Sequence, residues 1–211
     1  NVTTRVRVTP DTPFVVGDLT ETLSAVLLLQ CVGQRRLGLD EPIQRFGLSV
    51  PEPTATVRQL LSHTQPIAGF AYSPDRYAAL TDVMEWCAPQ PFRKSVAHRV
   101  LNRLAMIDSA PGTDWKNPAL SLPEGLFDQA DRDHYRAVLD RLAVPYKVQG
   151  RSKVERTELP VSGISATGGL VSTLRDLARF DRALDGEEGS LLRAETLAAA
   201  WSPVFVNGEP S

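Results

Sequence analysis

Two carboxylates, Asp18 and Glu21, lie three positions apart where a long apolar helix is predicted to begin. Residues at this spacing share a helix face, so both can act on one group. Nucleophilic attack by Asp18 and a carboxylate metal site are two possible chemistries. We favour a structural interpretation, a capping box with Asp18 at the N-cap and Glu21 at the third helical position. Two carboxylates alone make a poor metal site, and we predict neither a metal nor another cofactor.

Tyr72 is a further candidate for proton transfer. An unassisted phenol has a pKa of about 10 and is a weak base at neutral pH. The serine after it and then Pro74 predict the start of a helix, with proline at the first helical position. We predict that His63 is a structural histidine near a helix end rather than a catalytic one. The other two histidines, His98 and His134, lie on mixed helical faces without a set of catalytic partners.

The two cysteines, Cys31 and Cys87, each lie within an apolar helical stretch, 56 positions apart. This spacing matches neither a metal motif nor a disulfide framework. We favour two buried small hydrophobic side chains. A disulfide between them is the alternative that we favour less.

The pattern of apolar residues predicts a single, mainly α-helical domain over residues 1–211. Apolar side chains at helical spacing predict six or seven helices, which include residues 19–32, 56–62, 73–87, 92–104, 135–142, 173–184 and 194–201. Gly33 is placed to end the first of them, and Leu174 is predicted to lie on the inward stripe of the helix from residue 173. Alternating valines at 2, 6 and 8 predict one short strand. Residues 108–126 are predicted to form a long surface loop, and residues 149–160 are polar with weak patterning.

The composition excludes several functions. Apolar residues make up 42% and charged residues 23% of the chain, and the formal net charge is −2. The charges are interspersed, so the basic face that nucleic-acid binding needs is not present in the sequence. The longest apolar run, Ala25–Leu29, is far shorter than the roughly 20 residues that span a bilayer. We therefore expect neither a nucleic-acid-binding protein nor a membrane span.

Five segments, in this order and spacing, resemble the serine β-lactamase-like family, which includes class C β-lactamases, penicillin-binding proteins with DD-peptidase activity and related esterases. The match extends from about residue 10 to residue 202, and residues 56–64 and 166–180 are its most specific parts. The segments are Asp11-Thr-Pro-Phe-Val-Val-Gly17, Arg36-Leu-Gly-Leu-Asp-Glu-Pro42, Thr56-Val-Arg-Gln-Leu-Leu-Ser-His-Thr64, Tyr72-Ser73, and Ala166-Thr-Gly-Gly-Leu-Val-Ser-Thr-Leu-Arg-Asp-Leu-Ala-Arg-Phe180.

The resemblance implies a two-part fold, with an α/β sheet domain beside an all-helical domain and an active site between them. It also implies that family segments before the nucleophile and after this chain's last residue are missing here. Those segments build most of the sheet. We therefore expect this chain to form chiefly the helical portion of the fold.

The resemblance also implies where the catalytic groups should lie. The family's Ser-x-x-Lys, in which lysine assists deprotonation of the nucleophilic serine, is replaced by Asp18 and Glu21. Its Tyr-x-Asn motif is similar to Tyr72 followed by Pro74, and proline has no side-chain amide. Residues 166–169, Ala-Thr-Gly-Gly, imitate the Lys-Thr-Gly motif but lack its basic residue and lead towards a helix.

These replacements predict a domain that is catalytically inactive and acts in binding, scaffolding or regulation. The alternative is an enzyme that acts on β-lactams, peptidoglycan peptides or esters through a non-standard nucleophile. A cleft with Asp18 and Glu21 should favour cationic or neutral ligands over the carboxylate of a β-lactam. The surface that normally packs on the sheet should bind a protein partner or a second copy. The family habit implies an extracytoplasmic location, although the residues leave the compartment open.

Overall fold

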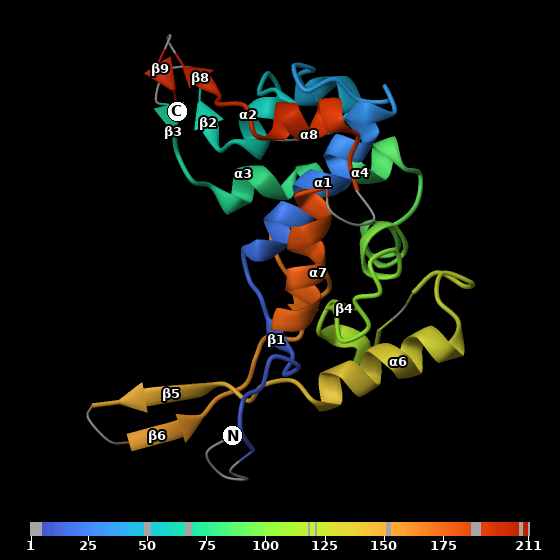
Figure 1. Ribbon diagram of the computed structural model, residues 1–211, viewed down its shortest axis with the longest axis vertical. Coiled ribbons are helices and arrows are strands. Elements are labelled where there is room, and N and C mark those ends of the chain that lie inside the picture. Colours follow the sequence, from blue (N-terminus) through green and yellow to red (C-terminus); the bar gives the residue numbers. More distant parts are fainter. Residues whose placement is uncertain are drawn as a thin grey trace.

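The computed structural model describes residues 6–48, 52–65, 69–117, 119–120, 122–150, 153–186, 191–206 and 209–210. Helices dominate this part of the chain, as the sequence predicts, and the strands are short (Figure 1). The helices are α1 (Leu19–Gly33), α2 (Val57–Leu61), α3 (Pro74–Ala78), α4 (Leu80–Cys87), α5 (Phe92–Val96), α6 (Gln129–Asp140), α7 (Leu174–Leu184) and α8 (Ala194–Ala200). A π-helical turn, η2 (Ala97–Leu101), continues α5, and the 3-10 turns are η1 (Ile43–Phe46) and η3 (Asp114–Lys116).

The largest sheet of the described chain has three antiparallel strands, and the first of them leads directly into α1. Its order is β1-β7-β4 (Phe14–Val15, Leu170–Ser172, Ala110–Pro111), with Phe14 opposite Ser172 and Ala110 opposite Val171. The central strand β7 is fully buried. The other strands form hairpins, which are β2-β3 (Thr64–Gln65, Gly69–Phe70), β5-β6 (Tyr146–Gln149, Lys153–Arg156) and β8-β9 (Phe205–Val206, Glu209–Pro210).

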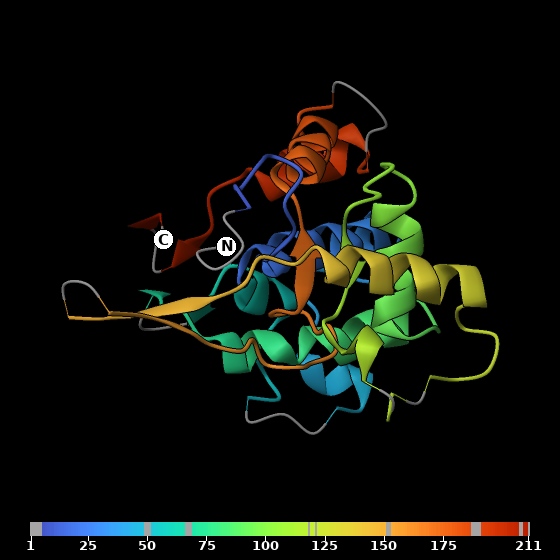
Figure 2. The same cartoon turned by 90° about the horizontal axis from the view of Figure 1, so that it is seen from below.

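Helix α1 lies at the centre of the larger hydrophobic core. Four of its five leucines, Leu23, Leu27, Leu28 and Leu29, are buried because α4, α5 and α8 all pack on this helix. A second core lies under α6, where Trp115, Phe127 and Tyr135 contact one another edge-on or tilted. Seen from below, α1 runs through the middle of the molecule and the β5-β6 hairpin projects away from it (Figure 2). None of the described helices is both long and apolar enough to cross a bilayer.

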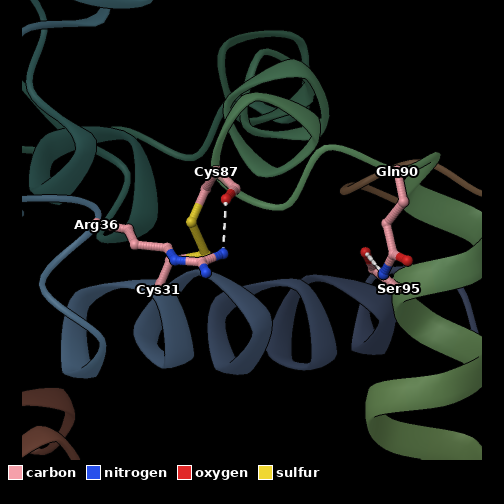
Figure 3. Close-up of a disulfide and its surroundings, with 5 residues drawn as sticks. All are labelled: Cys31, Arg36, Cys87, Gln90 and Ser95. Atoms are coloured by element: carbon pink, nitrogen blue, oxygen red, sulfur yellow. Dashed lines mark hydrogen bonds between the residues drawn. A yellow bond between two sulfur atoms is a disulfide. The ribbon is translucent and has the colours of Figure 1, made fainter.

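The disulfide between Cys31 and Cys87 corrects our favoured interpretation of the cysteines (Figure 3). Both residues are buried, as predicted, but they are bonded to each other, with their Cα atoms 6.4 Å apart. The bond joins the last turn of α1 to the end of α4. Sequence spacing did not reveal it, because the packing of these two helices brings the sulfur atoms together.

Two local predictions, about the start of the chain and about one loop, were wrong. Residues 6–8 form no strand and Val6 and Val8 are exposed, because no described strand pairs with them; residues 1–5 lie outside the described chain. The segment 108–126 is more than a surface loop, since it supplies β4 and the fully buried Trp115. The weakly patterned residues 149–160 contribute to the β5-β6 hairpin, whose valines face solvent.

Two predictions about helix faces and ends also need correction. Leu174 is exposed, and the buried face of α7 is formed by Asp176, Phe180 and Ala183. Helix α1 continues through Gly33, and the left-handed residue after it is Arg35, with φ of 57°. A Cβ atom at Gly33 would lie 2.9 Å from Thr196 Oγ1, so close packing against α8 explains this glycine.

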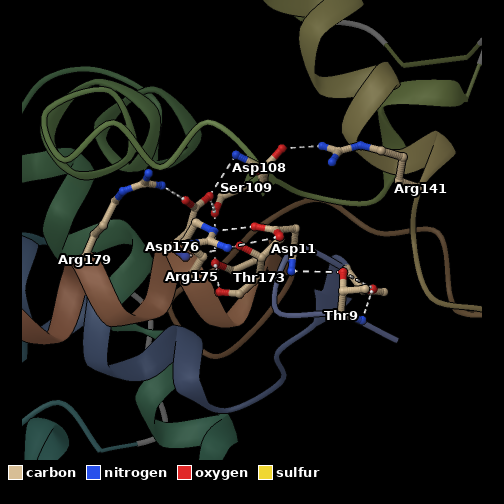
Figure 4. A network of polar contacts seen from close by, with 11 residues as sticks. Thr9, Asp11, Asp108, Ser109, Arg141, Thr173, Arg175, Asp176 and Arg179 are labelled. Atoms are coloured by element: carbon tan, nitrogen blue, oxygen red, sulfur yellow. Dashed lines mark hydrogen bonds and ion pairs between the residues drawn. The ribbon is translucent and has the colours of Figure 1, made fainter. Parts of the chain in front are cut away.

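Buried Asp176 ties α7 to the segment before β4 (Figure 4). Its carboxylate accepts hydrogen bonds from the Asp108 backbone N–H and the Ser109 hydroxyl, each at 2.8 Å, and pairs with Arg179. Thr173 caps the helix by accepting from the Asp176 N–H. A buried carboxylate such as that of Asp176 is stable only when its oxygens are paired. The second half of the family-like segment 166–180 therefore has a structural role.

Candidate functional site

The turn between β1 and α1 positions the two carboxylates. Gly17 has φ of 55°, a conformation that suits glycine. The N–H groups of Leu19, Thr20 and Glu21 donate to the carbonyls of residues 16, 17 and 18. Because these N–H groups have backbone partners, the Asp18 side chain makes no capping hydrogen bond. The Asp18 backbone is also already helical. The predicted capping box of Asp18 and Glu21 is therefore wrong, and both carboxylates are directed elsewhere.

Glu21 is the centre of a cluster of polar and aromatic side chains from α1, the end of α2 and α3. Its Oε2 lies 3.2 Å from His63 Nε2, and its Oε1 accepts from the Tyr72 hydroxyl at 3.5 Å. Its backbone carbonyl accepts from the Tyr77 hydroxyl at 2.8 Å. The Glu21 and His63 side chains are only 12% and 11% exposed. Three chain segments thus meet at the position that the resemblance assigns to a lysine.

His63 occupies a more central place than the sequence predicts. It follows α2, begun by the predicted capping box of Thr56 and Gln59, and has a left-handed φ of 51°. Its Nδ1 accepts from the Ser73 N–H at 3.3 Å, so the proton of the neutral ring lies on Nε2, facing Glu21. The ring stacks on Tyr77, with centroids 5.0 Å apart. No spacing rule links His63 to Glu21, because the contact depends on how α2 and α3 pack beside α1.

Electrostatics keep the tyrosines protonated. A hydrogen bond to Asp18, together with desolvation and the negative charge of Glu21, raises the pKa of Tyr72 to about 12. Burial raises the pKa of Tyr77 further, and Glu21 adds to that effect. Both phenols therefore donate hydrogen bonds at neutral pH and neither is available as a base.

Pro74 has the structural role predicted for it. It is the first residue of α3, and the Ser73 hydroxyl caps the helix by accepting from the Arg76 N–H. Residues 166–169 precede β7 and pack on α1. The Ala166 carbonyl accepts from the Ser24 hydroxyl at 2.8 Å, and a Cβ at Gly169 would lie 2.4 Å from the Gly163 carbonyl oxygen. This segment therefore needs glycine for close backbone packing.

The remaining candidates lie on other elements. His98 is on η2, where its ring contacts Phe127, and His134 is on α6, where its ring contacts Tyr135. Within the described ranges, no group of three or more histidine, cysteine, aspartate or glutamate side chains is arranged to hold a metal ion. Asp18, Glu21 and Tyr72 are brought together with His63, whereas Pro74 acts on α3.

The β-lactamase family model matches residues 1–211, and the chain belongs to that family. An octameric penicillin-binding protein homologue from Pyrococcus abyssi is 19% identical with a TM-score of 0.75, over 99% of this chain and 53% of that one. A penicillin-binding protein from Bacillus halodurans is 19% identical with a TM-score of 0.75, over 98% of this chain and 69% of that one.

A D-amino acid amidase from Ochrobactrum anthropi SV3 is 22% identical with a TM-score of 0.72, over 96% of this chain and 64% of that one. Likenesses at these identities establish the shared fold. The chain spans about half the length of the Pyrococcus homologue and about two thirds of the other two.

Proposed function

We propose that this chain is a β-lactamase-family domain that does not perform the family's serine chemistry and acts by binding, as a scaffold or regulator. The observation that carries the proposal is the first turn of α1, where Asp18 and Glu21 stand at the positions expected to hold the serine and lysine. Loss of a nucleophile alone can lower a hydrolytic rate by on the order of a millionfold.

The surroundings of Glu21 support this proposal. A lysine ammonium lowers the pKa of a neighbouring hydroxyl, whereas a carboxylate raises it. The pKa of Tyr72, at about 12, has the direction expected beside anions. At neutral pH only about one Tyr72 in 10⁵ is then a phenolate. Glu21 is also engaged by His63 and Tyr72, so it serves as a structural acceptor.

The charge of the site favours particular ligands. Asp18 and Tyr72 are exposed beside Glu21, and the two carboxylates attract cations and repel the carboxylate of a β-lactam. We expect calorimetric titrations to give weaker binding for an anionic β-lactam than for its neutral ester. Tighter binding of the anionic form would contradict this assignment.

Turnover tests the proposal. A chromogenic β-lactam and a p-nitrophenyl ester are offered to the protein and to Asp18→Ala, with an active serine β-lactamase as a reagent control. We expect neither form of this chain to exceed the background hydrolysis. Turnover that disappears in Asp18→Ala would identify Asp18 as a nucleophile and favour the alternative enzyme.

A further inference from the structure

A polar hollow of about 480 Å³ lies away from the Glu21 cluster, between the second half of α1, the π-helical turn η2 and the start of α8. Its lining includes the cationic side chains of Arg99, Arg103 and Arg193, and the amides of Gln30 and Gln34. None of its described lining residues is acidic. The hollow therefore gathers positive charge and hydrogen-bond donors from three elements.

A second hollow, of about 300 Å³, is also lined by Arg99, together with Arg36 and Gln90. The Arg36 guanidinium lies beside the disulfide and donates a long hydrogen bond of 3.4 Å to the Cys87 carbonyl (Figure 3). Arg99 lines both hollows. Its pKa is lowered, first by burial and then by the charge of Arg36. The two guanidinium groups thus repel each other.

Several other arginines have carboxylate partners, such as Arg58 with Asp40 and Arg175 with Asp11. No described carboxylate lies within ion-pair distance of Arg36, Arg99 or Arg193. Arg103 is engaged in another interaction. We therefore assign the uncompensated positive charge of the two hollows to Arg36, Arg99 and Arg193 only. Unpaired cations held close together are costly unless an anion joins them.

Helix-end carbonyls account for this cluster only in part, because Arg36 donates to the carbonyl of Cys87, the last residue of α4. The last carbonyls of α1, in contrast, accept from the backbone N–H groups of Gln34, Arg35 and Arg36, so no arginine side chain is needed there as a cap. Arg99 also lies within a π-helical turn, a conformation that is rare and recurs at functional sites.

We propose that the hollow lined by Arg36 and Arg99 binds a soluble phosphate-type anion, with these two arginines as its principal ligands, and that Arg193 in the adjoining hollow adds to the positive charge around it. Guanidinium groups donate two parallel hydrogen bonds to phosphate oxygens, and the bound charge relieves the repulsion between Arg36 and Arg99.

Calorimetric titration with inorganic phosphate tests this site, with sodium chloride at matched ionic strength as the comparison. We expect saturable binding of phosphate that is weakened about tenfold or more by Arg99→Gln and by Arg36→Gln. Arg45→Gln removes an exposed arginine that pairs with Glu41 outside the hollows, and it should bind phosphate normally.

Arg36 is exposed, so Arg36→Gln tests the site even if Arg99→Gln fails to fold. Circular dichroism spectra identify the folded variants. A melting temperature that rises with phosphate but not with matched chloride would agree with the proposal. No saturable phosphate binding, an equal loss in Arg45→Gln, or binding to phosphatidic acid vesicles without binding to inorganic phosphate would overturn it.

Discussion

At the scale of single residues, the hydroxyl of Tyr72 is the most direct reporter of the site's charge. It faces the carboxylates of Asp18 and Glu21, and its proton is held because loss of that proton would place a third negative charge beside them. The same two carboxylates define the functional proposal. The pKa of Tyr72 therefore reports the negative charge of the proposed site, and its measurement needs no ligand.

We predict that Asp18→Asn and Glu21→Gln each lower the pKa of Tyr72 from about 12 towards 10. Ultraviolet absorbance of tyrosinate, measured as the difference between each protein and its Tyr72→Phe form, gives this value. Asp75→Asn, an exposed carboxylate on α3, is the matched control and should leave the pKa unchanged. An unchanged Tyr72 titration in both test variants would contradict the arrangement of charges.

The same shift gives a pH dependence of stability. The folded pKa of Tyr72, at about 12, lies above the value near 10 of an unfolded tyrosine. The unfolded chain therefore loses this proton first, and the stability contributed by Tyr72 falls as the pH rises from about 10 to about 12. Tyr72→Phe should lack this component in urea titrations over that range.

At the scale of elements, α1 organises the molecule. One of its faces carries Glu21 towards α3, its buried leucines fill the main core, and its last turn is bonded to α4 through Cys31. The disulfide closes a chain segment of 56 positions that contains α2 and α3. It therefore restricts the conformations open to the unfolded chain. It also holds together the elements that bring His63 and Tyr72 to Glu21.

We predict that removal of this disulfide by the double substitution Cys31→Ala and Cys87→Ala lowers the free energy of unfolding by about 4 kcal/mol, from the loop-entropy relation. Urea titrations with and without a reducing agent measure the change. Reductant should destabilise the original protein only, because the double variant has no disulfide to reduce. Equal midpoints for the original protein and the double variant would show that the bond contributes little.

The sequence predicted those elements whose signal is local. Helical spacing located α1, and Thr56 with Gln59 and Ser73 with Pro74 located two helix starts, because a cap depends on neighbours within one turn. The Cys31–Cys87 bond and the Glu21–His63 contact were not predictable, because each joins elements distant in sequence. The capping role predicted for Asp18 was wrong because the backbone carbonyls of residues 16–18 already satisfy the helix start.

At the scale of the whole molecule, apolar surface remains near the start of α1 and beside α8. Leu19, Leu174 and Trp201 are more than half exposed. An apolar hollow of about 260 Å³ lies between α1, α2 and α8, and Trp201 is part of its rim. The hollow and the exposed Trp201 beside it form apolar surface of the kind that often marks interfaces.

We predict that this surface binds a protein partner or a second copy of the chain, and self-association is the case tested first. Light scattering should detect an oligomer, and Trp201→Ser should reduce its mass. Trp86→Ser, at an exposed tryptophan that contacts Phe46 elsewhere, is the matched control. A monodisperse monomer at all concentrations would contradict self-association.

The central claim, that Asp18 has replaced the reacting group of this family without taking over its chemistry, is tested most directly by covalent labelling. The protein is incubated with an acylating β-lactam and its intact mass is measured, with an active serine β-lactamase as the positive control. We predict no mass increase for this chain or for Asp18→Ala. A stoichiometric adduct that maps to Asp18 and is absent from Asp18→Ala would contradict the account and establish an aspartyl nucleophile.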